Sequence, residues 1–119
     1  MKLWVDDVRP APQGYLCAGR SVNEVKRSIE WVEESYSVME RQFYDRRAEW
    51  SDVEFYVIEL IDIDHDAGDY ASDGGDYIKL LDWLEETGRN YPIRIHSMNP
   101  VGVANMRAII QKNGWTEVR

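Results

Sequence analysis

Three short apolar runs that each end in polar side chains constrain the fold of this chain more than any other feature of its sequence. The runs span residues 2–5, 55–61 and 93–95. Polar residues follow them directly: Asp6 and Asp7, then Asp62, Asp64 and Asp66, then His96, Ser97 and Asn99. If the runs are parallel strands of one sheet, these side chains meet at its carboxyl edge, where open α/β sheets bind ligands.

A long helix is predicted after the first run. Ser21 and Glu24 have the spacing of a capping box, and apolar residues from Val22 to Phe43 then recur at steps of three and four. A helix extended over about 22–48 would be roughly 40 Å long, which is more than a small sheet can cover. We therefore expect its second half either to pack locally or to contact another copy in a homodimer.

Breaks and caps predict the remaining elements. Residues 9–14 contain two prolines and a glycine where the first crossover helix would stand, so that helix is expected to be reduced. The other expected elements are strands at 15–18, 55–63, 93–96 and 115–118, and helices at 76–87 and 100–112. This alternation predicts one α/β domain over residues 1–119, with a mainly parallel sheet.

Charge and composition limit the partners. Fourteen basic and 22 acidic residues give a net charge of −8, which opposes attraction to nucleic-acid backbones or anionic lipid. No apolar run suits a membrane span. The first residues lack the apolar region and cleavage site of a signal peptide, and the single Cys17 cannot form an internal disulfide. We expect a cytoplasmic protein that binds a polyanion only through a local exception such as a metal ion.

Carboxylates at two neighbouring strand ends predict a divalent metal site. Mg²⁺ takes oxygen ligands and keeps several waters, so two or three carboxylates are enough. Asp6, Asp7 and Asp64 fit this requirement, with Mg²⁺ or Mn²⁺ as the expected ion. Asp66 either joins them or turns the loop that follows. The alternative role for adjacent aspartates is loop solvation or helix capping. Asp62 shares a face of its strand with Asp64, because strand side chains alternate.

Two histidines and a helix start supply the other candidate groups. His65 and His96 lie at strand ends and can transfer protons near neutral pH, although a hydrogen bond to a neighbouring carboxylate is the alternative for His65. Asn99 and Gly102 lie where a helix begins, a place suited to an anion and equally to plain capping. Arg9 either neutralises the first aspartates or clamps a phosphate.

Taken together, these motifs resemble a known family. They comprise Trp4–Pro10, Asp64–Asp66, Asp73–Asp76 and His96–Gly102. The set is similar to that of the cyclic-phosphate-processing receiver-like domains, relatives of the phosphoacceptor receivers of two-component signalling. The resemblance implies a receiver-like (flavodoxin-like) three-layer sandwich with a reduced first helix and an elongated second one.

The same resemblance implies roles for individual residues. Asp6 and Asp7 match the acidic pair that holds Mg²⁺, Asp64 matches the phosphoacceptor position, and Ser97 matches the hydroxyl residue after the fourth strand. Receivers that store a phosphoryl group also need a lysine after the fifth strand. None of the four lysines lies after Trp115, which argues against ordinary aspartyl-phosphate signalling.

The sequence therefore predicts a metal-dependent phosphoesterase that processes a cyclic phosphate on a nucleotide or an RNA end. The catalytic candidates are His96, His65 and Asp64. The phosphate-binding candidates are Ser97, Asn99, Gly102 and Arg9, and the metal candidates are Asp6, Asp7, Asp64 and Asp66. The alternative is a non-catalytic receiver-like regulatory or binding module that dimerises through its long helix.

Overall fold

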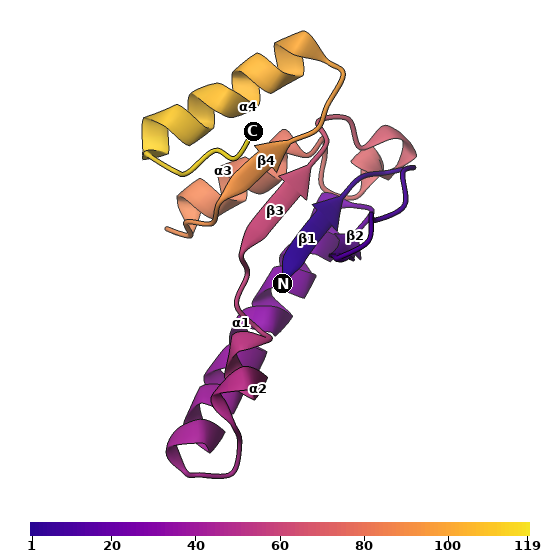
Figure 1. Ribbon diagram of the computed structural model, residues 1–119. Helices are drawn as coiled ribbons and strands as arrows, with labels where there is room; N and C mark the ends of the chain where they lie inside the picture. The colour runs from indigo at the N-terminus through magenta and orange to yellow at the C-terminus, as the bar shows by residue number, and fades with distance from the viewer.

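A parallel sheet forms the centre of the molecule. The computed structural model describes residues 1–119 and contains four strands: β1 (Lys2–Val5), β2 (Tyr15–Gly19), β3 (Leu60–Ile63) and β4 (Ile93–Ile95). They lie in the order β2-β1-β3-β4, and every neighbouring pair is parallel (Figure 1). The predicted α/β class with a parallel sheet is confirmed.

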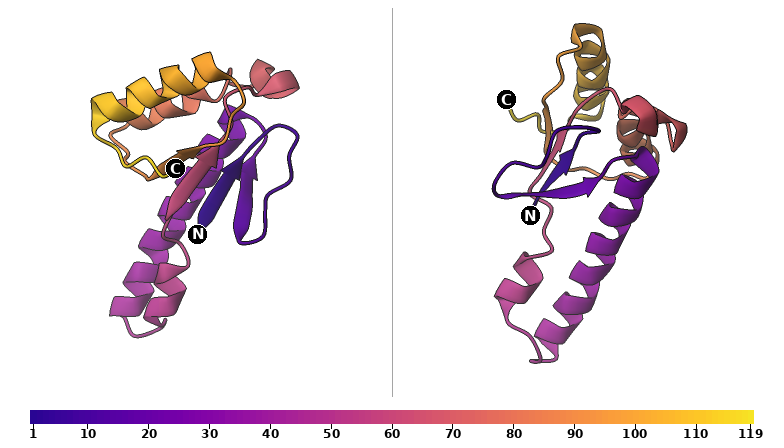
Figure 2. Two further views of the ribbon diagram at one scale, coloured as in Figure 1. Left: turned by 45° about the horizontal axis from the view of Figure 1, so that its top comes forward. Right: turned by 90° about the vertical axis from the view of Figure 1, so that its right-hand side faces the viewer.

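Helices follow three of the four strands. They are α1 (Val22–Tyr44), α2 (Trp50–Glu54), α3 (Ile78–Glu86) and α4 (Pro100–Asn113), with a 3₁₀ helix, η1, at Gly68–Ser72. Between β1 and β2 the chain forms a loop instead of a helix, as the prolines predict. In the right-hand view of Figure 2 this loop lies on the opposite side of the strands from α1. No helix has the length and apolar composition that crossing a membrane would require.

The two faces of the sheet have different surroundings. Val5 and Ile63 pair in register and join one apolar core with side chains of α1, α3 and α4. Strand alternation puts Trp4, Asp62 and Arg94 on the other face, again in register. The helices therefore leave this second face to the loop after β1, where the Arg9 carbonyl accepts a hydrogen bond from Trp4 Nε1 at 3.0 Å.

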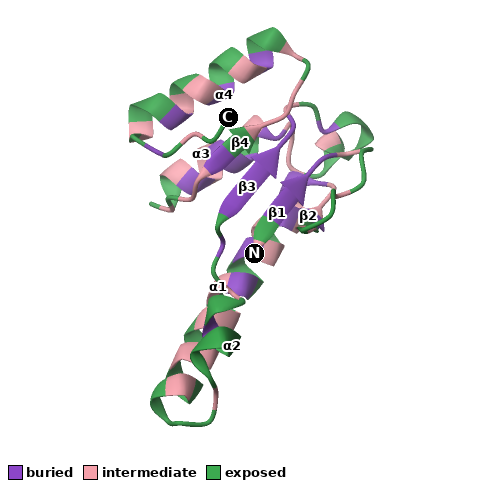
Figure 3. Ribbon diagram, in the orientation of Figure 1, coloured by how far each residue is buried: buried purple, intermediate pink, exposed green.

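The long helix ends in a hairpin that the sequence did not predict. Helix α1 stops at Tyr44 instead of near residue 48, and the chain turns at Arg46, which adopts a left-handed φ of 61°. Residues 50–54 then fold back as α2, with Val53 fully buried and the Phe43 and Trp50 rings 5.2 Å apart. The chain's own α2 thus packs on the distal half of α1, and the homodimer stays a prediction (Figures 1 and 3).

The hairpin also corrects the predicted strand at 55–63, which begins only at Leu60. Phe55 caps α2, and its side chain is 59% exposed. A short apolar run does not by itself distinguish a buried strand from a segment that packs on a helix. The carboxyl end of the strand, which positions the site, lies where the sequence placed it.

Caps fix the last helix and the chain end. The Asn99 side chain accepts a hydrogen bond from Gly102 N at 3.0 Å, and Pro100 opens α4. Gly114 ends the helix with a φ of 66°, the left-handed conformation that glycine tolerates best. The strand predicted at 115–118 is reduced to one bridge between Ile93 and Glu117.

Candidate functional site

The carboxyl ends of β1, β3 and β4 bring two aspartates and a histidine together. Asp6, Asp64 and His96 each offer one ligand atom, and these atoms lie within 4.8 Å of one another. Asp6 is fully buried and Asp64 is 7% exposed. The local chain aims Asp6, because its Oδ1 accepts hydrogen bonds from Val8 N at 2.9 Å and Arg9 N at 2.7 Å. Such a turn is a common use of an aspartate after a strand.

One arginine bridges the two carboxylates. Arg9 Nε lies 3.0 Å from Asp6 Oδ2, and Arg9 NH2 lies 3.5 Å from Asp64 Oδ2. The Arg9 side chain is 48% exposed, so its guanidinium covers the outer side of the cluster. Arg9 was predicted either to neutralise aspartates or to clamp a phosphate, and in this structure it neutralises them.

His96 lies deeper, between two carboxylates. Its Nδ1 is 2.6 Å from Asp62 Oδ1 and its Nε2 is 2.9 Å from Asp6 Oδ2. The ring stacks on Trp4 with 4.0 Å between centroids and 2° between planes. Burial lowers the pKa of His96, but the hydrogen bonds to Asp62 and Asp6 outweigh burial and leave that pKa raised.

The pKa of Asp6 moves in the opposite direction. Burial raises it, but the backbone N–H groups of Arg9 and Val8 and the hydrogen bond from His96 leave it lowered overall. Asp6 is therefore held as a carboxylate, the form that binds cations. Asp62, which the sequence placed at this edge but not among the catalytic, phosphate-binding or metal candidates, belongs to this network. The strand alternation that placed it on the face of Asp64 was the available signal.

The other predicted residues form a second group beside the cluster. His65 Nδ1 lies 2.7 Å from Asp66 Oδ1, and Asn99 Nδ2 lies 3.5 Å from the same oxygen. Ser97 Oγ accepts a hydrogen bond from Asn99 N at 3.1 Å, and Gly102 N is occupied by the Asn99 cap. The structure thus joins His65, Asp66, Ser97, Asn99 and Gly102 around the start of α4 and leaves Asp66 outside the cluster of Asp6, Asp64 and His96.

Asp7 also lies outside that cluster. Its carboxylate packs against Gly68, where an added Cβ would collide with Asp7 Oδ2. Asp7 still contributes to the local field: burial, followed by the charges of Asp7, Asp6 and Asp64, raises the pKa of Tyr77. Its predicted role as a metal ligand stays a prediction.

Comparison with known families identifies the architecture. A family model, the cyclic-phosphate processing receiver domain, matches residues 1–112. The chain belongs to this family. No curated protein and no solved structure gives a match. The match covers the strand ends that carry Asp6, Asp64 and His96, and these residues lie at the carboxyl edge of the sheet, where open α/β sheets bind ligands.

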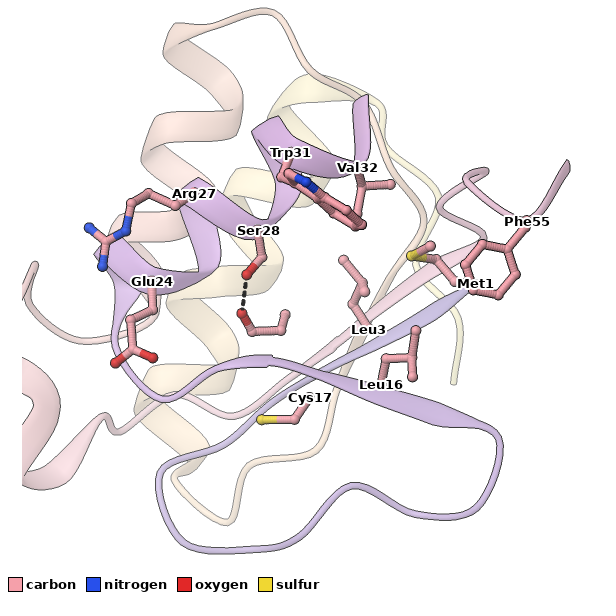
Figure 4. A pocket seen from close by; sticks show the side chains of 11 residues that line it. Met1, Leu3, Leu16, Cys17, Glu24, Arg27, Ser28, Trp31, Val32 and Phe55 are labelled. Atoms are coloured by element: carbon pink, nitrogen blue, oxygen red, sulfur yellow. Dashed lines mark hydrogen bonds between the residues drawn. The ribbon is translucent and has the colours of Figure 1, made fainter. Parts of the chain in front are cut away.

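An apolar groove of this receiver domain lies away from the carboxylates. It has a volume of about 640 Å³ and runs between β2 and α1, with Leu16, Trp31 and Phe55 among its apolar walls and Glu24 and Arg27 at one end (Figure 4). It holds no histidine and no pair of carboxylates. The volume of a groove therefore does not point to the cluster of Asp6, Asp64 and His96.

Gly102 makes close packing at the α4 start possible. A Cβ at this position would overlap the His65 ring. Alanine normally stabilises a helix relative to glycine by about 0.5–1 kcal/mol, but overpacking costs about 1–3 kcal/mol. We expect Gly102→Ala to lower the free energy of unfolding of the receiver domain by about 1 kcal/mol or more.

A double-mutant cycle tests this prediction. In a His65→Ala background the collision is gone, so Gly102→Ala is expected to raise the free energy of unfolding instead. Urea denaturation of the four proteins measures both effects. Equal effects of Gly102→Ala in the two backgrounds would show that the His65 ring does not restrict this position.

Proposed function

We propose that this receiver domain is a metal-dependent phosphoesterase that opens a cyclic phosphate. The observation that carries the proposal is the meeting of Asp6, Asp64 and His96 at the carboxyl edge, in a chain of a family named for cyclic-phosphate processing. Opening the ring adds water across one P–O bond, which breaks and leaves a linear phosphate monoester. Such chemistry needs a cation near the phosphate and a group that moves a proton.

The donor set fits a divalent cation. Asp6 and Asp64 would hold such an ion through buried carboxylate oxygens, and His96 Nε2, 2.9 Å from Asp6 Oδ2, offers a third ligand atom. Arg9 supplies positive charge to the same carboxylates. When bound, a divalent ion supplies Lewis-acid stabilisation of the phosphate and lowers the pKa of a bound water.

Arg9 is the residue that would meet the phosphate. It pairs with both carboxylates that the metal would take, and its side chain is half exposed. Once a cation satisfies Asp6 and Asp64, the guanidinium can turn outward and hold two phosphate oxygens. Ser97 and Asn99, at the start of α4, would add a hydroxyl and an amide donor on the other side.

His65 is the imidazole best placed to move a proton. Both nitrogens of His96 face carboxylates, whereas His65 bonds to Asp66 through Nδ1 alone. Asp66 therefore orients the His65 ring and fixes its tautomer, which leaves Nε2 for the attacking water or the leaving oxygen. Asp64 enters this proposal as a metal ligand, since the chain has no lysine at the receiver position to support a phosphorylated aspartate.

Turnover of defined cyclic phosphates tests the proposal. The full chain is incubated with 2′,3′-cyclic and 3′,5′-cyclic nucleotides and with an RNA carrying a 2′,3′-cyclic end, with added divalent metal or with EDTA. We expect ring opening of at least one cyclic substrate, none in EDTA, and no hydrolysis of the linear monoester products. Absence of ring opening with Mg²⁺, Mn²⁺, Co²⁺ and Zn²⁺ would overturn the proposal and favour a regulatory module.

A further inference from the structure

The His96 ring has one fixed orientation. Its nitrogens contact Asp62 and Asp6, Trp4 covers one face, and only 12% of its side chain is exposed. Turning the ring over would exchange Nδ1 with Cδ2 and Nε2 with Cε1, and would aim C–H groups at both carboxylates. Nε2 is therefore held toward the cluster that also contains Asp64.

Asp62 determines which nitrogen keeps a proton. Its side chain is 2% exposed and stands in register with Trp4, behind the ring as viewed from the cluster. A carboxylate can only accept, so both ring nitrogens carry a hydrogen in the metal-free chain, and a metal ion at the cluster would displace the one on Nε2 while Asp62 keeps the one on Nδ1. Metal-bound histidines are oriented in this way, by a carboxylate on the nitrogen remote from the metal.

We propose that His96 Nε2 is a metal ligand together with Asp6 and Asp64, that Asp62 is its positioning residue, and that the site selects transition metal ions such as Zn²⁺ or Co²⁺ over Mg²⁺. The inference rests on the metal site of the proposed function. It differs from the carboxylate site for Mg²⁺ or Mn²⁺ that the sequence predicts, because Mg²⁺ favours oxygen ligands and waters whereas an imidazole nitrogen favours later first-row ions.

The contacts of the site agree with this assignment. Without metal, the Nε2 hydrogen faces Asp6 Oδ2 and Arg9 Nε lies 3.0 Å from the same oxygen. A metal ion at this cluster would replace both of these donors at Asp6 Oδ2. A Mg²⁺ site would need only the carboxylates of Asp6 and Asp64. The buried Asp62 would then orient a histidine that does not bind the metal. The buried Asp62–His96 pair is the feature that separates the two kinds of site.

Nitrogen NMR of the histidine rings is a direct test. The chain has two histidines, so protein labelled with ¹⁵N-histidine shows two rings, which His65→Gln and His96→Gln assign. After removal of metal with EDTA, addition of Zn²⁺ is expected to shift the Nε2 resonance of His96 and to leave its Nδ1 protonated. Zn²⁺ bound with an unmoved His96 Nε2 resonance would overturn the inference.

Affinities complete the test. In calorimetric titrations Co²⁺ and Zn²⁺ are expected to bind the unaltered chain at least about tenfold more tightly than Mg²⁺, and equal affinity would contradict the proposal. Asp62→Asn is expected to weaken Zn²⁺ binding about 10–100-fold and to shift the His96 Nδ1 resonance. Unchanged affinity and an unchanged Nδ1 resonance in a folded Asp62→Asn protein would remove Asp62 from this role.

The outcome is separable from that of the proposed function. Zn²⁺ on His96 Nε2 without ring opening of any cyclic phosphate would keep the metal assignment and reject the phosphoesterase. Ring opening with Mg²⁺ and an unmoved His96 resonance would reject the metal assignment and keep the phosphoesterase. The main NMR readout uses the unaltered chain, so the stability of a variant does not decide it.

Discussion

Replacing Asp6 by alanine is expected to lower the free energy of unfolding of the metal-free receiver domain by about 3 kcal/mol, because removing one partner from a buried charged network leaves the others unpaired. Asp6 is fully buried and accepts hydrogen bonds from Val8 N, Arg9 N and His96 Nε2. It also pairs with Arg9 Nε at 3.0 Å. None of these donors has a substitute acceptor on an alanine side chain.

Two opposing effects act at this position, and their sizes decide the sign. Asp6 lies near Asp64, so its removal relieves repulsion between carboxylates. It also leaves His96 Nε2 and two backbone N–H groups without their acceptor, and each buried donor without a partner costs about 1–3 kcal/mol. We expect the lost hydrogen bonds to dominate, because Arg9 already compensates the repulsion from the outer side.

Asp7 provides the matched control for this measurement. It is the adjacent aspartate and carries the same charge, but its carboxylate packs against Gly68 outside the network. In urea denaturation with EDTA present, we expect Asp7→Ala to change the free energy of unfolding by less than about 1 kcal/mol. Equal losses for Asp6→Ala and Asp7→Ala, or a gain for Asp6→Ala, would contradict the network described here.

The comparison of sequence and structure shows which features are local. The strand ends at Val5, Ile63 and Ile95 could be predicted because apolar runs stop there and polar residues follow. The Asn99 cap and the Gly114 stop are equally local signals. The α2 hairpin was missed because its two apolar residues, Trp50 beside Phe43 and the buried Val53, depend on contacts that form only where the long helix turns back. Periodicity in residues 55–59 carries no information about this turn.

The candidate site divides in the same way. Asp6, Asp64 and His96 were predicted from their places at strand ends, and parallel strands bring such residues together. Their partners depend on side-chain direction across the sheet, which the sequence specifies only once register is known. Trp4 pairs with Asp62 in that register, and this pairing puts the ring and the carboxylate beside His96. Loop geometry likewise decides that Asp6 and Asp64 lie beside His96 while Asp66 lies beside His65, and the sequence does not reveal that geometry.

Asp64→Asn is expected to reduce the proposed metal-dependent ring opening by about 100-fold or more, since loss of a proposed direct ligand should exceed the 10–100-fold typical of outer partners. The backbone N–H of His65 donates a hydrogen bond to Asp64 Oδ1 at 2.8 Å, and the Oδ1 of an asparagine can accept the same bond. The local fold therefore has a replacement acceptor, whereas the charge that attracts the metal and Arg9 is lost. Calorimetric metal titration is expected to show a parallel loss of affinity.

Asp69→Asn is the control for this charge change. Asp69 lies five residues further on in η1, is exposed, and belongs to no cluster of candidate ligands. We expect its rates and metal affinity to stay within about threefold of the unaltered chain, as for most surface substitutions. Both variants lose one negative charge. Equal rates for Asp64→Asn and Asp69→Asn would show that the position of the lost carboxylate does not matter, and Asp64 would then not be a metal ligand. A selective loss in Asp64→Asn would instead tie the reaction to the carboxyl edge of β3.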